Sequence, residues 1–158
     1  MRKINSLDRI DHALLTLLQT DASLSLNALA EAVKLSPTPC WRRIQRLEAD
    51  GVIKKRVTLL DPQSINVGVT VFVSVKTNQH NAPWLKKFAQ IIAAIPEVVE
   101  VYRMSGDIDY LLRVVVPDIA GYDAVYKKLI RDIELFDVSS SFAMEQLKYT
   151  TALPLDYA

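Results

Sequence analysis

One stretch, Ser36 to Gly51, constrains the fold of this chain more than any other; it reads SPTPCWRRIQRLEADG. Serine is favoured immediately before a helix, and a proline at the first helical position costs no hydrogen bond. Ser36 and Pro37 supply this pair. Gly51 can adopt the left-handed backbone conformation that ends many helices. The sequence therefore predicts a helix that begins after Ser36 and ends before Gly51.

The predicted helix has two unlike sides. At about 100° per residue, its apolar side chains fall on one side; they are Cys40, Ile44 and Leu47. The opposite side carries Thr38, Trp41, Arg42 and Gln45, flanked by Arg43 and Arg46. Such a side suits an element that reads base edges in the major groove of DNA. A surface helix with a solvated charged side is the alternative, so the neighbouring segments decide.

Two amphipathic segments precede this helix. Residues 8–20 have apolar side chains at helical spacing and Asp8 as a cap, and residues 26–33 have Ser25 as a cap. Only Lys34 and Leu35 then separate the second segment from Ser36. Two helices joined by so tight a turn, the second with a polar side, predict a helix-turn-helix.

A cationic segment follows Gly51. Residues 52–53 and 57–60 have strand-like composition and flank Lys54, Lys55 and Arg56. We expect a small hairpin, or wing, whose basic edge contacts phosphates. Residues 61–64 are typical of a turn, so we expect the DNA-binding domain over 1–60 and a linker over 61–67.

Charge and composition narrow the function further. Residues 1–60 hold ten Lys/Arg and six Asp/Glu, whereas residues 61–158 hold nine Lys/Arg and twelve Asp/Glu. A basic half joined to an acidic half indicates that the first binds a polyanion. No apolar run is long enough to span a membrane, the N-terminus lacks a signal peptide, and Cys40 is the only cysteine. We therefore expect a cytoplasmic protein, and we expect no metal because His12 and His80 stand far apart.

The second half has the order strand, helix, strand, repeated once. The expected elements are strands at 69–76, 98–104, 110–116 and 138–147, and helices at 83–95 and 119–133. This order predicts a ferredoxin-like βαββαβ domain over 68–158, and an α+β fold for the whole chain. In such a domain the helices cover one sheet face only. Dimerisation is the simplest way to cover the other.

The chain resembles the Lrp/AsnC, or leucine-responsive, family of bacterial and archaeal regulators over essentially its whole length. The matching segments are residues 7–11, 29–31, 35–43, 46–48, 51–53 and 105–112. Lys34 departs from the pattern, because such turns often have the more permissive glycine. Residues 139–146 look most like the cysteine-responsive branch. The resemblance implies a transcription regulator in which a winged helix-turn-helix domain is linked to a ferredoxin-like effector domain.

Chemistry and position assign the DNA-contacting residues. Thr38, Trp41, Arg42, Gln45 and Arg46 are expected to face the groove, with Arg42 suited to guanine and Gln45 to adenine. The expected phosphate ligands are Ser36, Arg43, Lys54, Lys55 and Arg56. Trp41 packing against the hairpin is an alternative. A redox role for Cys40 is disfavoured, because it falls on the apolar side of its helix, where a cysteine is usually inert.

The loop around Gly106 allows three interpretations. Asp107 and Asp109 resemble a catalytic carboxylate pair, but no nucleophile or histidine accompanies them. A simple turn is the second interpretation. The third comes from the family resemblance, which implies an amino-acid effector between dimers. The residues carried over are Met104, Ser105, Gly106, Asp107 and Asp109, with Tyr102 and Tyr110 as walls.

Together these expectations describe a sequence-specific DNA-binding regulator with no cofactor, no metal and no catalytic site. Its partners would be double-stranded DNA, an amino-acid effector and further copies of itself, as a dimer and then a tetramer or octamer. It would be associated with the nucleoid. An architectural protein that coats DNA without sequence preference is the runner-up. An enzyme or metabolite carrier is the third possibility.

Overall fold

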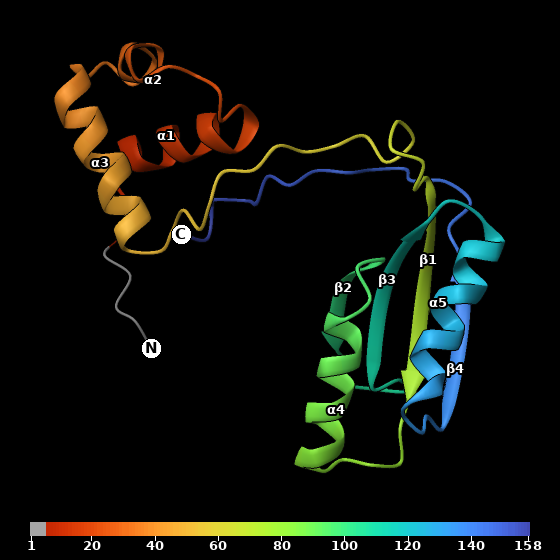
Figure 1. The fold of residues 1–158 in the computed structure, drawn as a ribbon. Coiled ribbons are helices and arrows are strands. Elements are labelled where there is room, and N and C mark those ends of the chain that lie inside the picture. The colour runs from red at the N-terminus through yellow and green to blue at the C-terminus, as the bar shows by residue number, and fades with distance from the viewer. Residues whose placement is uncertain (1–5) are drawn as a thin grey trace. The chain divides into compact units, whose positions relative to one another are not determined.

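The computed structural model describes residues 6–158, which form two compact units (Figure 1). The first contains the described residues up to Thr58 together with Lys148–Ala158, and the second is Leu59–Leu147. The first five residues, part of the N-terminus expected to lack a signal peptide, lie outside the described part. Within residues 6–158, no helix combines the length and apolar character needed to cross a membrane.

Helix α1, Arg9–Thr20, begins where the sequence predicted, because Asp8 forms a reciprocal capping box with Asp11. Asp8 Oδ1 accepts the backbone N–H groups of Ile10 and Asp11, each at 2.9 Å. In return, Asp11 Oδ2 accepts the Asp8 N–H at 3.1 Å. These bonds satisfy amide donors that a helix N-terminus otherwise leaves unpaired.

The predicted helix-turn-helix is confirmed. Helix α2, Leu26–Ala32, is capped by Ser25, and α3, Pro37–Ala49, begins after Ser36. Lys34, in the turn between them, has a φ of 57°, so it adopts the left-handed conformation without the help of a glycine. The buried core of this unit joins all three helices; it consists of Leu14, Leu18, Leu29, Ala30, Cys40 and Ile44.

The prediction of two short strands in the wing is wrong. Gly51 ends α3 with a φ of 75°, as predicted, but residues 54–60 run without a strand partner. Val57, Leu59 and Leu60 are all exposed. A two-stranded hairpin needs a surface to pack against, and these side chains find none within the described chain. The basic residues of the segment therefore lie on backbone without regular secondary structure.

The second unit has the predicted ferredoxin-like topology. Its helices are α4, Ala82–Ala93, and α5, Ile119–Arg131. Its strands are β1, Val69–Lys76; β2, Val98–Arg103; β3, Tyr110–Val116; and β4, Asp137–Phe142. They form one antiparallel sheet in the order β2-β3-β1-β4. Strands β1 and β3 lie at its centre.

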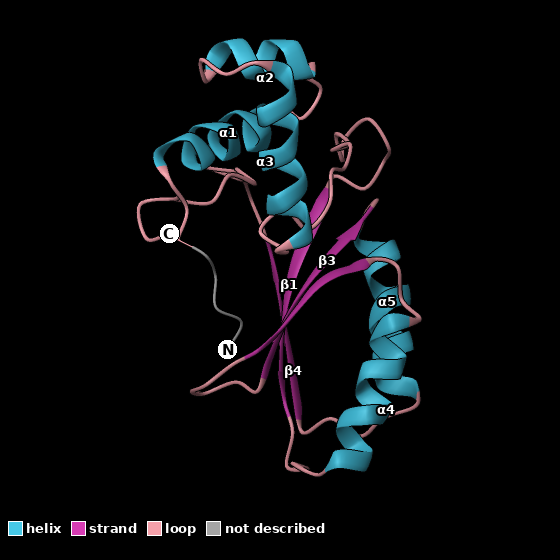
Figure 2. Ribbon diagram, turned by 90° about the vertical axis from the view of Figure 1, so that its left-hand side faces the viewer, coloured by secondary structure: helices cyan, strands magenta, loops and turns pink. Residues whose placement is uncertain are grey.

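Helices α4 and α5 cover the same face of this sheet (Figure 2). The core between the two layers consists of Val71, Val73, Val75, Trp84, Phe88, Ile95, Tyr110, Leu112, Val114, Val116, Tyr122, Val125, Leu129 and Ile133. On the other face, Phe72 lies opposite Arg113 in the register of β1 and β3. Phe72 is 40% exposed. This face is therefore uncovered within the second unit, as the sequence predicted.

The last strand is shorter than expected. The sequence predicted a strand to Leu147, but β4 ends at Phe142. The Ala143 N–H still donates to the Thr70 carbonyl of β1 at 2.9 Å. Strand β1 begins at Val69, so the later residues have no partner strand. Met144 and Leu147 are consequently exposed.

The C-terminal tail packs on the helical unit through a reciprocal amide contact. Gln19 Nε2 donates to the Leu153 carbonyl at 3.0 Å, and the Leu153 N–H donates to Gln19 Oε1 at 2.9 Å. The glutamine side chain thus bonds the tail as a neighbouring strand would. This contact attaches a segment that follows the sheet domain to the end of α1.

We expect Gln19→Ala to release the tail, because both bonds are lost. Hydrogen exchange of the Leu153 amide should accelerate roughly 2- to 10-fold, which corresponds to the ~0.5–1.5 kcal/mol of one hydrogen bond. Gln19→Glu is the matched control, since it keeps an acceptor for that amide. Unchanged exchange in Gln19→Ala would contradict the contact.

Candidate nucleic-acid interface and effector loop

Helix α3 presents the two sides that the sequence predicted. Cys40, Ile44 and Leu47 are at most 4% exposed, and burial raises the pKa of the Cys40 thiol. Cys40 is therefore an apolar core residue, as expected. The four side chains opposite are exposed, and we call them the recognition face: Thr38, Trp41, Arg42 and Gln45. About half of the Trp41 surface is exposed to solvent.

The recognition face is only lightly engaged by its own chain. Gln45 Nε2 donates to Glu48 Oε2 at 3.0 Å, and Glu48 Oε1 accepts from Arg56 at 3.1 Å. Among residues 6–158, no ion pair engages Arg42, Lys54 or Lys55. These three exposed cations are thus available to an anionic partner.

Ser36 occupies the N-cap position of α3 without using its side chain. Its hydroxyl makes no capping hydrogen bond, and the residue is exposed. Pro37 and Pro39 have no backbone N–H, and the Cys40 N–H donates to the Ser36 carbonyl at 3.3 Å, so Thr38 supplies the free amide of this first turn. The unused Ser36 hydroxyl beside it can bind a phosphate oxygen. Ser36 therefore fits the phosphate contact predicted for it, which stays a prediction.

Arg43 and Arg46 are engaged elsewhere than the sequence suggested. Arg43 Nη1 donates to Asp8 Oδ2 at 2.6 Å and to Asp11 Oδ1 at 2.9 Å. Arg46 Nη2 donates to the other oxygen of Asp11. Both arginines thus bind carboxylates of α1, and their expected DNA contacts compete with this internal role.

Asp11 has a role that was not among the sequence-based predictions. This carboxylate is 1% exposed, and it accepts the Asp8 N–H as well as both guanidiniums. One signal was available, because Asp11 precedes Leu14, Leu15 and Leu18 by three, four and seven residues. Those leucines are buried, so the same spacing places Asp11 on the inward side of α1.

The hydrogen bonds around Asp8 keep both partners charged. The Asp11 backbone N–H, and then the Arg43 guanidinium, lower the pKa of the Asp8 carboxyl. The hydrogen bonds to Asp8 and Asp11 in turn raise the pKa of Arg43. The Asp8–Arg43 pair is therefore ionic at neutral pH.

The candidate effector loop joins β2 to β3 and is attached to the end of β1. The Met104 N–H donates to the Asp109 carbonyl at 2.8 Å, and the Asp109 N–H donates to the Val75 carbonyl at 3.0 Å. Asp109 Oδ2 accepts the backbone N–H of buried Thr77 at 2.8 Å. Asp109 is thus a structural acceptor, so its carboxylate and that of Asp107 have different surroundings.

The tip of this loop is open. Gly106 has a φ of 130°, a conformation that L side chains rarely adopt. Ser105 and Asp107 beside it are exposed, and Met104 is 40% exposed. The structure thus brings together Ser105, Gly106 and Asp107 as a polar tip with free backbone groups.

The two tyrosines expected as walls lie in different surroundings. Tyr110 is buried, with its ring centroid 4.8 Å from that of Phe88 and 5.9 Å from that of Trp84. It belongs to the helix-covered core, and within one chain it does not line the loop tip. Tyr102 is half exposed, and its hydroxyl donates to Glu100 at 3.0 Å, which raises the pKa of Tyr102.

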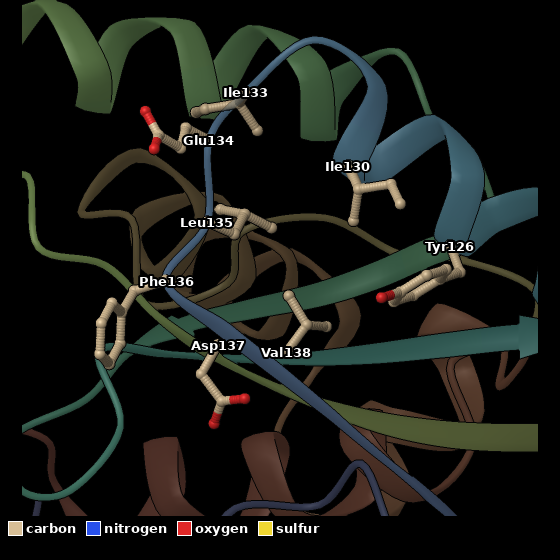
Figure 3. Close-up of a pocket in the computed structure, with 8 residues that line it drawn as sticks. All are labelled: Tyr126, Ile130, Ile133, Glu134, Leu135, Phe136, Asp137 and Val138. Atoms are coloured by element: carbon tan, nitrogen blue, oxygen red, sulfur yellow. The ribbon is translucent and has the colours of Figure 1, made fainter.

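A separate hollow of about 400 Å³ lies where α5 leads into β4 (Figure 3). Its lining consists of Tyr126, Ile130, Ile133, Glu134, Leu135, Phe136, Asp137 and Val138. None of the predicted site residues is among them. The lining has two carboxylates and no Lys or Arg, so it offers no side-chain cation for the carboxylate of a free amino acid.

The described residues also bear on metal binding. Among residues 6–158, no group of three or more His, Cys, Asp or Glu side chains is placed to hold a metal ion. The carboxylates that do meet, on α1, are paired with arginines. Charge at that site is balanced by guanidiniums.

Two family models match this chain and divide it much as the fold does. Residues 7–54 match a model described as winged helix-turn-helix DNA-binding. Residues 70–153 match a model described as the Lrp/AsnC ligand binding domain. The first match contains the recognition face, and the second contains the loop at Gly106.

Individual relatives match over nearly the full length. The Escherichia coli K12 DNA-binding transcriptional activator DecR is 52% identical over 151 residues, which cover 95% of this chain and 99% of that protein. The structure of an AsnC family transcriptional regulator from Agrobacterium tumefaciens superposes with a TM-score of 0.92 at 62% identity, covering 96% and 99% of the two chains. The structure of a Neisseria meningitidis transcriptional regulator in complex with L-Met superposes with a TM-score of 0.91 at 33% identity. It too covers 96% of this chain and 99% of the other.

We expect Asp109→Ala to reduce the free energy of unfolding by about 1–3 kcal/mol, because the buried Thr77 N–H loses its acceptor. Chemical denaturation monitored by circular dichroism measures this change. Asp107→Ala is the matched control at an exposed position of the same loop and should stay within about 0.5 kcal/mol of the parent. Equal losses in the two variants would contradict the structural role of Asp109.

Proposed function

Because the chain belongs to the Lrp/AsnC family of transcriptional regulators, we propose that it binds DNA by inserting the recognition face of α3 into the major groove. One observation carries this proposal. The exposed side of α3 presents Arg42 and Gln45 side by side in space, while the opposite side is buried in the helical core. Both side chains can form paired hydrogen bonds with a purine base.

Separate tasks are proposed for the residues around these two. Arg42 reads guanine and Gln45 reads adenine, while Thr38 and Trp41 make the apolar contacts within the groove. The phosphate ligands are Ser36, Lys54, Lys55 and Arg56. Phosphate contacts set the affinity and its salt dependence, whereas base contacts set the sequence preference.

Assembly is the second part of the proposal. The uncovered sheet face, with Phe72 at its centre, would be buried against a second copy. A dimer presents two helix-turn-helix units, which suit a pseudo-palindromic site with half-sites about one helical turn apart or a multiple of it. Dimers would assemble further to a tetramer or octamer. The protein would work in the cytoplasm, associated with the nucleoid.

The loop tip at Ser105, Gly106 and Asp107 is proposed to hold an amino-acid effector between dimers. Its exposed carboxylate can bind an ammonium group, and its free backbone groups can bind a carboxylate. The L-Met complex of the Neisseria regulator supports an amino acid as the chemical class. Such an effector acts only through a difference in its affinity for the two assembly states.

Arg42→Ala should reduce the preference for a selected site over scrambled DNA roughly 5- to 150-fold, the equivalent of ~1–3 kcal/mol for one paired base contact. Lys55→Ala should instead weaken binding to both DNAs and reduce the salt slope by about 0.9 for each subunit bound. Fluorescence anisotropy over a salt series, with a site selected from random DNA, measures both effects.

An unchanged preference in Arg42→Ala would show that this arginine does not read bases. Equal affinity of the parent protein for selected and scrambled DNA would favour the architectural alternative, because a coating protein has a specificity ratio near one.

The effector proposal has its own measurement. We would add a panel of amino acids that includes L-methionine and L-cysteine to the parent protein. One of them should change either the assembly state, measured by analytical ultracentrifugation, or the affinity for DNA. Asp107→Ala should abolish this response and leave DNA binding without effector unchanged. A response that persists in Asp107→Ala would place the effector elsewhere.

A further inference from the structure

A clasp of four charged residues joins α1 to α3 beside the recognition face. It consists of Asp8 and Asp11 on the side of α1, and Arg43 and Arg46 on the side of α3. Each pair is spaced three residues apart, so each lies on one side of its helix. Arg43 touches both carboxylates and Asp11 touches both guanidiniums. The four groups therefore act as one unit.

The centre of the clasp is the buried carboxylate of Asp11. A buried charge that loses its partner is strongly unfavourable, because neither water nor another group replaces the lost interaction. Asp11 is 1% exposed. If Arg43 and Arg46 moved to DNA phosphates, they would leave this carboxylate buried and uncompensated. The clasp should consequently stay closed when DNA binds.

The clasp fixes the direction in which the two proposed base readers face. Arg42 directly precedes Arg43, and Gln45 directly precedes Arg46. Each proposed base reader is thus the immediate neighbour of a clasped arginine. The apolar contacts of α3 are non-directional, whereas these ion pairs require defined geometry. Rotation of α3 about its axis would break the ion pairs and move both readers together.

The charges of the clasp also cancel. Two carboxylates face two guanidiniums, so this part of the surface adds little positive potential toward DNA. Within α3 and the segment that follows it to residue 58, the exposed cations without an ion-pair partner are Arg42, Lys54 and Lys55. In this part of the chain, the electrostatic attraction to phosphates therefore comes mainly from these residues and from half-exposed Arg56.

We propose that Asp8 and Asp11 are positioning residues for sequence recognition, acting through Arg43 and Arg46, and that these two arginines are not phosphate ligands. The proposal rests on the DNA-binding function proposed above. It replaces the sequence-based assignment of both arginines to DNA with an orienting role inside the helical unit.

The test compares affinities of the full chain for the selected site and for scrambled DNA over a salt series. Asp8→Asn keeps the oxygen that caps α1 and removes the charge that faces Arg43. We expect it to lower the preference for the selected site about 3- to 10-fold with an unchanged salt slope. If Asp8 instead withheld Arg43 from phosphate, Asp8→Asn would tighten binding to both DNAs alike, which would overturn the proposal.

Arg43→Gln and Arg46→Gln test the arginines directly. Each should lower the preference for the selected site and leave the salt slope unchanged, and Arg46→Lys should restore part of the preference because it returns a cation to Asp11. Lys55→Gln is the matched control. It should reduce the salt slope of DNA binding by about 0.9 for each subunit and leave the preference for the selected site unchanged. A similar slope reduction in Arg43→Gln or Arg46→Gln would overturn the proposal.

A double-variant cycle completes the test. Asp8→Asn combined with Arg43→Gln should lower the preference no further than Arg43→Gln alone, because the second change removes an interaction already lost. Additive losses of preference in the double variant would contradict the proposed role of the clasp. So would an unchanged preference in Asp8→Asn and Arg43→Gln variants whose circular dichroism matches that of the parent protein. Binding of the parent protein to neither DNA, or to both alike, would instead contradict the proposed function and the clasp with it.

Discussion

The burial of one narrow apolar side of α3 is the interaction on which the DNA-binding unit depends. Cys40 and Ile44 pack with Leu14 of α1 and Leu29 of α2, which forces the opposite side of α3 outward. Apolar packing determines which side of α3 faces outward, but it restrains small rotations of the helix less than directional contacts do. The ion pairs of Asp11 provide such contacts, so the core and the clasp together define the recognition face.

The second unit follows a different constraint, since its helices cover one sheet face only. Tyr110, Trp84 and Phe88 fill the covered side, while Arg113 binds Glu100 on the uncovered side at 2.7 Å and lowers the pKa of that carboxyl. The loop at Gly106 is attached by hydrogen bonds to β1 at its base and open at its tip. The base of this loop is thus held by the sheet, whereas its tip is exposed.

Much of the fold could be predicted because its signals are local. The caps at Asp8 and Ser25, the turn at Lys34 and the end of α3 at Gly51 depend on residues within one helical turn. The errors arose where structure depends on distant partners. The strands expected at residues 52–53, at 57–60 and beyond Ala143 have suitable composition, but within the described chain no neighbouring strand pairs with them.

The element order, the helix-turn-helix and the two sides of α3 follow from the order of the residues, because helical periodicity is a property of the chain alone. The directions of the charged and aromatic side chains depend on packing between distant segments. Asp11 meets Arg46 across 35 residues, and no local spacing encodes that contact. Tyr110 begins a strand that is apolar at nearly every position, so alternation could not assign its face. Only the packing of α4 against β3 placed it in the core.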